Sequence, residues 1–221
     1  IIRQDKDSVF ISADTLFSAK LTDLKGTKSL LLNDTIAHKN DSLLKNNKQK
    51  NDSTNRYFEA FSNVKIFTDS LQAISDSLFY SFQDSVFRMY KDPIVWGQGN
   101  QITGDTILLF TQNKQPKKIE AIENSLMVQQ IENESYNQVQ ATRIDGFFSN
   151  GVLDSVRAKG SVLSIYFVQE EDNSYVGSND CASDILDLYM QNKELYKVAF
   201  RGEFKCTLNP IQRKKPKDAR V

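Results

Sequence analysis

Short runs of β-branched and aromatic residues alternate with polar segments through the centre of the chain, from Asn63 to Phe110. Such runs are typical of β-strands, and the segments between them carry the Gly, Pro, Asn, Asp and Ser residues that tight turns favour. The step from one run to the next is close to the roughly 8–12 residues of an all-β meander. The pattern predicts four consecutive strands, at 78–80, 86–90, 94–96 and 107–110, with a hairpin turn at 97–100.

The second half of the chain continues in the same way. Residues 119–140 fit either one helix face or two strands, and the all-β surroundings favour strands. Beyond them the pattern predicts polar or glycine-bearing turns at 112–118, 149–151 and 176–183, and strands at 146–148, 152–156, 161–168, 184–190 and 195–201.

A short motif recurs along the chain: a small residue, an aspartate, a hydroxyl residue, then Leu or Ile. It is clearest at Asp14, Asp76 and Asp105, with weaker echoes at Asp145 and Asp184. From Asp76 on, the copies recur at intervals of some thirty to forty residues, which is typical of stacked β units. Paired carboxylates could also serve a glycosidase, and stacked Asp turns could bind calcium. The constant position in the repeat favours a structural role.

The apolar residues that flank the aspartate lie an odd number of positions apart, five for Ile102 and Ile107 and also for Ile11 and Leu16. A regular strand with a period of two cannot place both on one face. The sequence therefore predicts a bulge or bend near the aspartate, whose side chain would accept hydrogen bonds from the freed backbone amides.

Three segments in order, NVKIFTDSLQAISDSLFYS, SVFRMYKDPIVWGQGNQITGDTILLF and KIEAI, resemble the OstA-like family of lipopolysaccharide-transport proteins, above all those of the Bacteroidetes. This family includes LptA, LptC and the N-terminal domain of LptD. The resemblance covers residues 57–208 and 7–20. It implies an all-β, V-shaped β-jellyroll of antiparallel strands with an open hydrophobic groove, located in the periplasm and without catalytic activity or cofactor.

The same resemblance implies the partners. The groove would bind the acyl chains of lipid A, and the protein would bridge inner- and outer-membrane Lpt components. Edge strands would pair with other Lpt jellyroll proteins or with a second copy of this chain. Whether the chain acts as bridge, anchor or translocon domain stays open.

Composition divides the chain into four parts. Residues 1–20 form a first β unit and 57–208 the main jellyroll, while 209–221 are a basic tail. Between them, residues 21–56 are dominated by Lys, Asn, Asp, Ser and Thr, which predicts a partly disordered excursion or linker. Within it, Thr35 and Ser42 follow aspartates and precede Ile or Leu, a pattern similar to the O-glycosylation signal of Bacteroidetes periplasmic proteins.

The chain is rich in aromatic residues, with fourteen Phe, eight Tyr and one Trp. They could form an ordinary closed core or line a groove for lipid, where each buried methylene contributes about 0.8 kcal/mol. Eleven residues on predicted strands are the candidate lipid contacts: Ile66, Leu78, Phe87, Met89, Ile94, Trp96, Ile107, Leu109, Phe148, Ile165 and Phe167.

Little in the sequence supports catalysis, a metal or nucleic-acid binding. The formal net charge is zero, and the one histidine, His38, lies in the polar excursion away from any partner for a triad or metal site. The segment Gly97-Gln98-Gly99 is a turn and not a dinucleotide fingerprint. No apolar run is long enough for a membrane span. Cys181 and Cys206 could form one disulfide or remain two thiols.

Two other classes of function stay open. A glycan-binding or adhesin module would have a closed, dry core and an aromatic platform on its outer surface. A carbohydrate-active β-helix enzyme would need two carboxylates that converge in a cleft.

Overall fold

A computed structural model describes residues 9–22, 55–68, 71–131, 135–170, 174–192 and 194–210. Apart from a short 3₁₀ turn at 21–22, all regular structure in these ranges is antiparallel β-strand, so the all-β prediction is confirmed. The strands are β1 (Phe10–Ser12), β2 (Thr15–Lys20), β3 (Arg56–Phe67), β4 (Gln72–Ser81), β5 (Val86–Tyr90), β6 (Ile94–Gly97), β7 (Asn100–Thr103), β8 (Thr106–Gln112), β9 (Gln115–Gln130), β10 (Tyr136–Ser149), β11 (Val152–Gln169), β12 (Tyr175–Gln191) and β13 (Glu194–Pro210).

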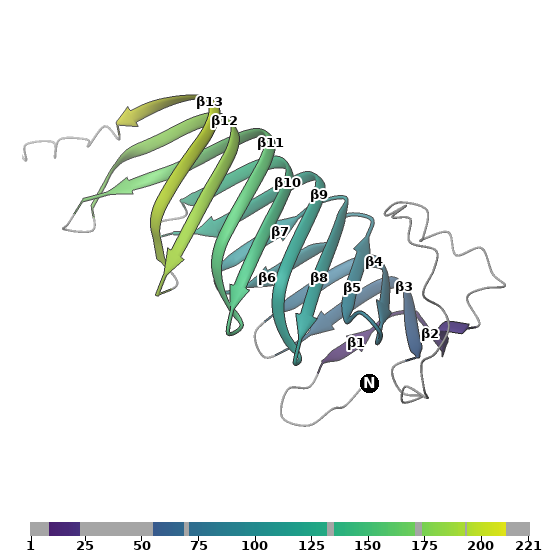
Figure 1. The fold of residues 1–221 in the computed structure, drawn as a ribbon. Coiled ribbons are helices and arrows are strands. Elements are labelled where there is room, and N and C mark those ends of the chain that lie inside the picture. Colours follow the sequence, from purple (N-terminus) through teal and green to yellow (C-terminus); the bar gives the residue numbers. More distant parts are fainter. Residues whose placement is uncertain are drawn as a thin grey trace, which may run out of the picture.

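The thirteen strands form one sheet that folds over on itself into two layers. Its main path runs β1-β3-β4-β5-β8-β9-β10-β11-β12-β13. The short strands β6 and β7 lie behind this path (Figure 1), where β6 pairs with β4 and β7 pairs with β9. Strands β4, β5, β8, β9, β7 and β6 thereby close into a six-stranded barrel.

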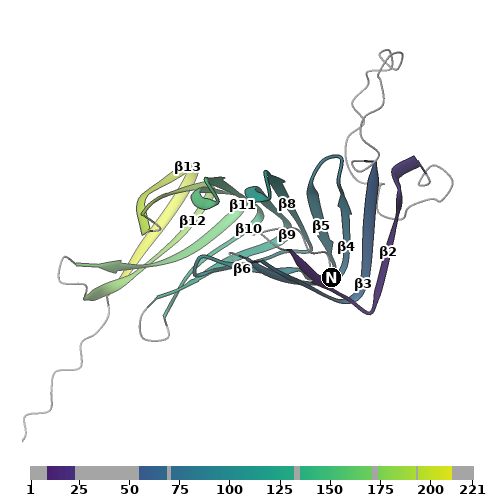
Figure 2. The same ribbon diagram turned by 90° about the horizontal axis from the view of Figure 1, so that it is seen from below.

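The long strands belong to both layers. We call the segments 115–122, 143–149, 152–159, 185–191 and 194–201, with β5 and β8, the front layer. The back layer holds β6, β7 and the segments 125–130, 136–141, 162–169, 175–183 and 203–210. Figure 2 shows both layers at the β10–β13 end of the molecule, seen from below.

Each long strand bends at the same level, where the hydrogen-bond register shifts. In β9 the bend is at Glu123 and Asn124, in β11 at Gly160 and Ser161, and all four residues have positive φ. Such residues occupy the left-handed region, which turns the chain sharply and is typical of a bulge.

The predicted bend at Asp105 is confirmed. Strand β7 ends at Thr103 and β8 begins at Thr106, so Asp105 lies at the corner between the layers. The corner changes the alternation of side chains, and both Ile102 and Ile107 therefore point into the core.

The other two corners differ from the prediction in detail. A bend at Asp14 separates β1 from β2, but Leu16 beyond it is half-exposed. At Asp76 strand β4 runs straight through, and two residues of β3, Ser62 and Asn63, lie opposite this single residue, so the one extra residue belongs to β3. The repeat therefore marks the corner, while the bulge belongs to the neighbouring strand.

Three of the corner aspartates bind the bulged strand, whereas Asp76 pairs with Lys91 at 2.9 Å. Among the described contacts of these three, one is to a backbone amide, as expected. Asp184 Oδ2 accepts a hydrogen bond from the Glu203 amide at 3.0 Å. Asp14 and Asp105 instead accept hydrogen bonds from side-chain amides, those of Asn63 at 2.8 Å and Asn124 at 3.0 Å. Both asparagines have positive φ, a conformation that asparagine tolerates better than most residues.

Most of the predicted strands are present. The four central ones are confirmed, as are the strands within 119–140 and the hairpin turn at 149–151. The turn predicted at 176–183 is wrong, because these residues continue β12; Asp180 there is bound by Ser178 and Asn209. The turn at 112–118 is also too long, since β9 already begins at Gln115.

Several sequence predictions lie outside the described residues. Thr35, Ser42 and His38 belong to this group, as do most of the polar excursion 21–56 and all but the first two residues of the basic tail 209–221.

The bend in β11 gives a test of the corner. In Gly160→Ala the new Cβ would lie 2.7 Å from Thr142 Oγ1 and 2.9 Å from Thr142 Cβ, with φ near +81°. We expect a loss of unfolding free energy well above the roughly 1–2 kcal/mol that a left-handed alanine alone costs, measured by urea denaturation.

Gly151→Ala is the matched control. Gly151 has nearly the same φ, +77°, but its added Cβ would meet nothing closer than 3.7 Å. Equal losses in the two variants would show that contact with Thr142 does not constrain the corner.

Candidate functional site: the space between the two layers

An apolar cavity of about 100 Å³ lies between the layers at the β9–β13 end. Beyond the barrel, the described strand pairings join front segments to front segments and back segments to back segments, and the strands themselves connect the two layers at their bends. The space between the layers is therefore filled by side chains alone. The apolar lining consists of Met127, Val139, Ile165, Tyr166, Leu186, Leu188, Met190, Leu195, Val198 and Phe200.

The front wall comes from alternate positions of β12. Leu186, Leu188 and Met190 point into the cavity, while Asp187 between them points outward. This is the period of two that an extended strand imposes.

Part of the polar lining of the back wall is internally paired. Asn137 Nδ2 donates to Gln129 Oε1 at 3.3 Å, and Asn137 Oδ1 accepts from the Phe167 amide at 3.0 Å. None of the residues that line the cavity is charged. Its surface is therefore suited to an apolar group.

Cys181, which lines the cavity, forms a disulfide with Cys206 across β12 and β13. The alternative left open by the sequence is thereby decided in favour of the bonded pair. The two residues are direct neighbours in the sheet, with Cα atoms 4.1 Å apart. The bond fixes the register of β13 against β12.

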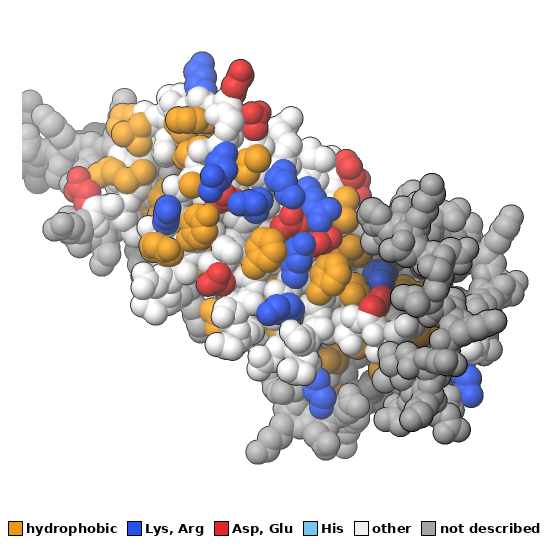
Figure 3. Space-filling model, viewed as in Figure 1, with side chains coloured by type: hydrophobic (Ala, Val, Ile, Leu, Met, Phe, Trp, Pro, Cys, Tyr) orange, Lys and Arg blue, Asp and Glu red, His pale blue; other side chains and the backbone are white. Residues whose placement is uncertain are grey.

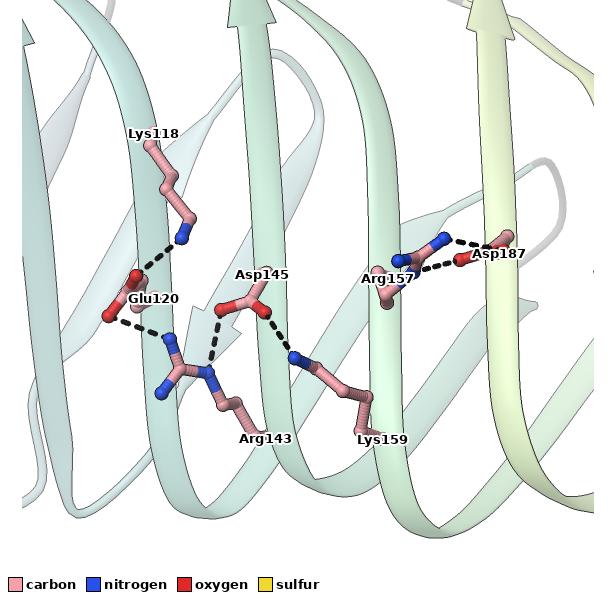
Figure 4. Close-up of polar contacts among 7 residues, drawn as sticks. All are labelled: Lys118, Glu120, Arg143, Asp145, Arg157, Lys159 and Asp187. Carbon is pink, nitrogen blue, oxygen red and sulfur yellow. Dashed lines mark hydrogen bonds and ion pairs between the residues drawn. The ribbon is translucent and has the colours of Figure 1, made fainter.

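The outer surface of the front layer carries a ladder of ion pairs. Basic side chains gather over this face, with carboxylates between them (Figure 3). Glu120 is bound by Lys118 and Arg143, and Asp145 by Arg143 at 2.8 Å and Lys159 at 3.1 Å (Figure 4). One strand further, Arg157 and Arg201 hold the two oxygens of Asp187 at 2.6 and 2.8 Å.

The cations cover the carboxylates. The Asp187 side chain is 4% exposed and Asp145 5%, whereas Arg157 and Arg201 are about half-exposed. Hydrogen bonds from Arg157 lower the pKa of Asp187; burial opposes this shift and Arg201 reinforces it. Burial alone would raise the pKa of Asp145, but hydrogen bonds from Arg143 and Lys159 outweigh it, so this pKa is also lowered.

Most of the sequence-predicted groove residues lie elsewhere. Six are buried in the hydrophobic core and do not line the cavity: Ile66, Leu78, Phe87, Met89, Ile107 and Leu109. Closure of the barrel is the reason, because β6 and β7 cover the core that an open groove would expose.

The remaining five candidates are dispersed. Ile94 and Trp96 flank the buried Val95, so they point away from the core. Phe148 lines a small cavity beside Leu153, and Phe167 packs on Tyr175. Ile165 is the one candidate that lines the cavity between the layers. The alternation in the segment ILDLYM (185–190) was the sequence signal that could have identified the front wall.

Within the described ranges, no helix has the length and apolarity needed to cross a membrane, and no group of three or more His, Cys, Asp or Glu residues is arranged to hold a metal ion.

No protein-family model matches the chain, and no curated protein matches it either.

The ion-pair ladder predicts how stability depends on pH. Because the pKa of folded Asp187 lies below its ordinary value of 3.8, its ion pairs stabilise the fold above that pH and are lost as the pH falls through the folded pKa. We expect Asp187→Asn to lower the unfolding free energy by about 2 kcal/mol at neutral pH. We also expect the variant to lose less unfolding free energy than the parent protein when the pH falls from neutral to about 3, measured by urea denaturation.

Asp84→Asn is the control for this prediction. The Asp84 side chain is 42% exposed against 4% for Asp187, and an ion pair of an exposed carboxylate contributes at most about 1 kcal/mol. If acid lowers the unfolding free energy of Asp187→Asn as much as that of the parent protein, the ion-pair ladder does not stabilise the fold as expected.

Proposed function

We propose that the chain is a carrier of lipopolysaccharide that holds acyl chains of lipid A between its two layers. The observation that carries the proposal is the apolar cavity lined by Leu186, Leu188, Met190, Val198 and Phe200. Each methylene removed from water contributes about 0.8 kcal/mol, so an uncharged apolar channel of this kind favours a fatty chain over a polar ligand.

The cavity of about 100 Å³ is smaller than a fatty acyl chain. Binding a chain therefore requires the layers to separate at the β10–β13 end. Such a movement breaks none of the described strand pairings, because each of them lies within one layer and the layers are connected by the bends. The closed barrel forms a fixed end against which the layers can open.

The fold supports an OstA/LptA-type jellyroll. Two sheet layers, a corner repeated in successive strands and an edge strand at each end of the described sheet are what such a unit needs. Strand β13 has a free edge in the described part of the chain, with Phe204 and Leu208 well exposed. This edge suits strand pairing with another Lpt jellyroll or a second copy of the chain, as a protein that bridges inner- and outer-membrane components would require.

The periplasm is the location that we propose for this carrier. The disulfide between Cys181 and Cys206 supports it, because such bonds persist in oxidising compartments. Transport of this kind requires no catalytic group.

The test is a substitution in the front wall. Leu188→Gln places an unpaired amide in the apolar cavity, at a cost of about 1–3 kcal/mol to an occupant that cannot hydrogen-bond it. We expect binding of fluorescent lipid A by the purified protein to weaken about tenfold or more.

Leu163→Gln is the matched control, because Leu163 is 53% exposed and lies outside the cavity. Its lipid affinity should equal that of the parent protein. Urea denaturation of both variants separates a loss of binding from a loss of folding. A parent protein that binds no lipid A, or two folded variants that bind it equally, would overturn the proposal.

A further inference from the structure

A second hollow, of about 730 Å³, lies outside the barrel on the outer surface of the back layer. It differs from the inner cavity in chemistry: its lining combines aromatic rings with side-chain amides, and none of the described residues that line it is charged. The side chains that matter here are those of Gln72, Trp96, Gln101, Gln130 and Tyr136.

Strand register brings these residues together from five strands. Gln72 of β4 is paired with Trp96 of β6, which is paired with Gln101 of β7. On the next strands, Gln130 of β9 is paired with Tyr136 of β10. Alternation sends all of them away from the core, since the buried Val95 and Met127 lie at intervening positions.

The aromatic ring at the centre of the hollow is held in place. Trp96 Nε1 donates to Gln101 Oε1 at 2.8 Å, which fixes the orientation of the indole. Beside it, the turn at Gln98 is anchored to the β10–β11 hairpin by hydrogen bonds to Gly151 and Leu153. The hollow is therefore built on a rigid frame.

We propose that this hollow binds an uncharged saccharide. A pyranose ring has apolar C–H faces, which pack on aromatic rings such as Trp96 and Tyr136, and a rim of hydroxyl groups. Side-chain amides both donate and accept hydrogen bonds, as hydroxyl groups do, so Gln72, Gln101 and Gln130 complement that rim. The volume lies in the usual range for small-ligand sites.

Other ligand classes fit the hollow less well. A phosphate or carboxylate would need a cation, and none of the described lining residues is one. A fatty chain would leave the side-chain amides unpaired. The inference does not depend on the lipid-carrier role, because the saccharide site lies on the opposite face of the back layer from the cavity.

The single tryptophan of the chain gives a direct readout, since Trp96 lies in the proposed site. We would titrate the full chain with maltohexaose, cellohexaose and mannohexaose and follow the intrinsic fluorescence. We expect a saturable change with at least one of these saccharides, and about tenfold weaker binding in Tyr136→Ala.

Tyr196→Ala is the matched control, because Tyr196 is an exposed tyrosine on β13 outside the hollow, and we expect its affinity to equal the parent's. Leu188→Gln should also leave the titration unchanged, which separates this inference from the carrier proposal. No saturable change with any of the three saccharides, at up to about 10 mM, would overturn the inference. So would equal weakening in the two tyrosine variants.

A saccharide could come from a free glycan or from the head of a glycolipid. Titration with lipopolysaccharide and with its delipidated polysaccharide distinguishes these sources. Equal saturable binding of the two would support a site that needs only sugar. Fluorescence changes that require the acyl chains, together with none from the oligosaccharides, would contradict it.

Discussion

Every strand that crosses between the layers must bend at the level where its neighbours bend, and the rest of the structure depends on this constraint. The extra residues lie on alternate strands: Asn124 on β9, Gly160 on β11 and Gly202 on β13, all with positive φ. The strands between them pass the corner with one residue, Thr142 or Asp184, whose side chain binds the bulged neighbour. Register is therefore fixed at one line across the sheet.

That line of corners explains why one end of the molecule is closed and the other is not. Near β4 and β9, the short strands β6 and β7 complete the back layer and pair with both flanks, which closes the barrel. Beyond β9 the same strands supply both layers, and each described pairing lies within one layer, so the bends alone connect the layers there. An apolar cavity can form there without exposing unpaired backbone groups.

The sequence predicted the bend near Asp105 but not the closure of the barrel. Odd spacing between Ile102 and Ile107 required a change of face near Asp105, and this inference needed only local geometry. The pairing of β7 with β9 joins residues far apart in the chain, and no local pattern reports it. Leu78 and Ile107 could thus be assigned to strands but not to the core of a closed barrel. The position of Trp96 on the outer face of the back layer was not predicted for the same reason.

Because a strand alternates its side chains, one sheet presents three surfaces of different chemistry. Along β9, Met127 lines the inner cavity, Val128 and Gln130 line the outer hollow, and Glu120 beyond the bend joins the ion-pair ladder. Along β12, Leu186 lines the inner cavity and Asp187 joins the ion-pair ladder. Neighbouring residues therefore contribute to different surfaces and a single substitution affects mainly one of them, so the proposed lipid cavity, the proposed saccharide hollow and the acid stability can be tested separately.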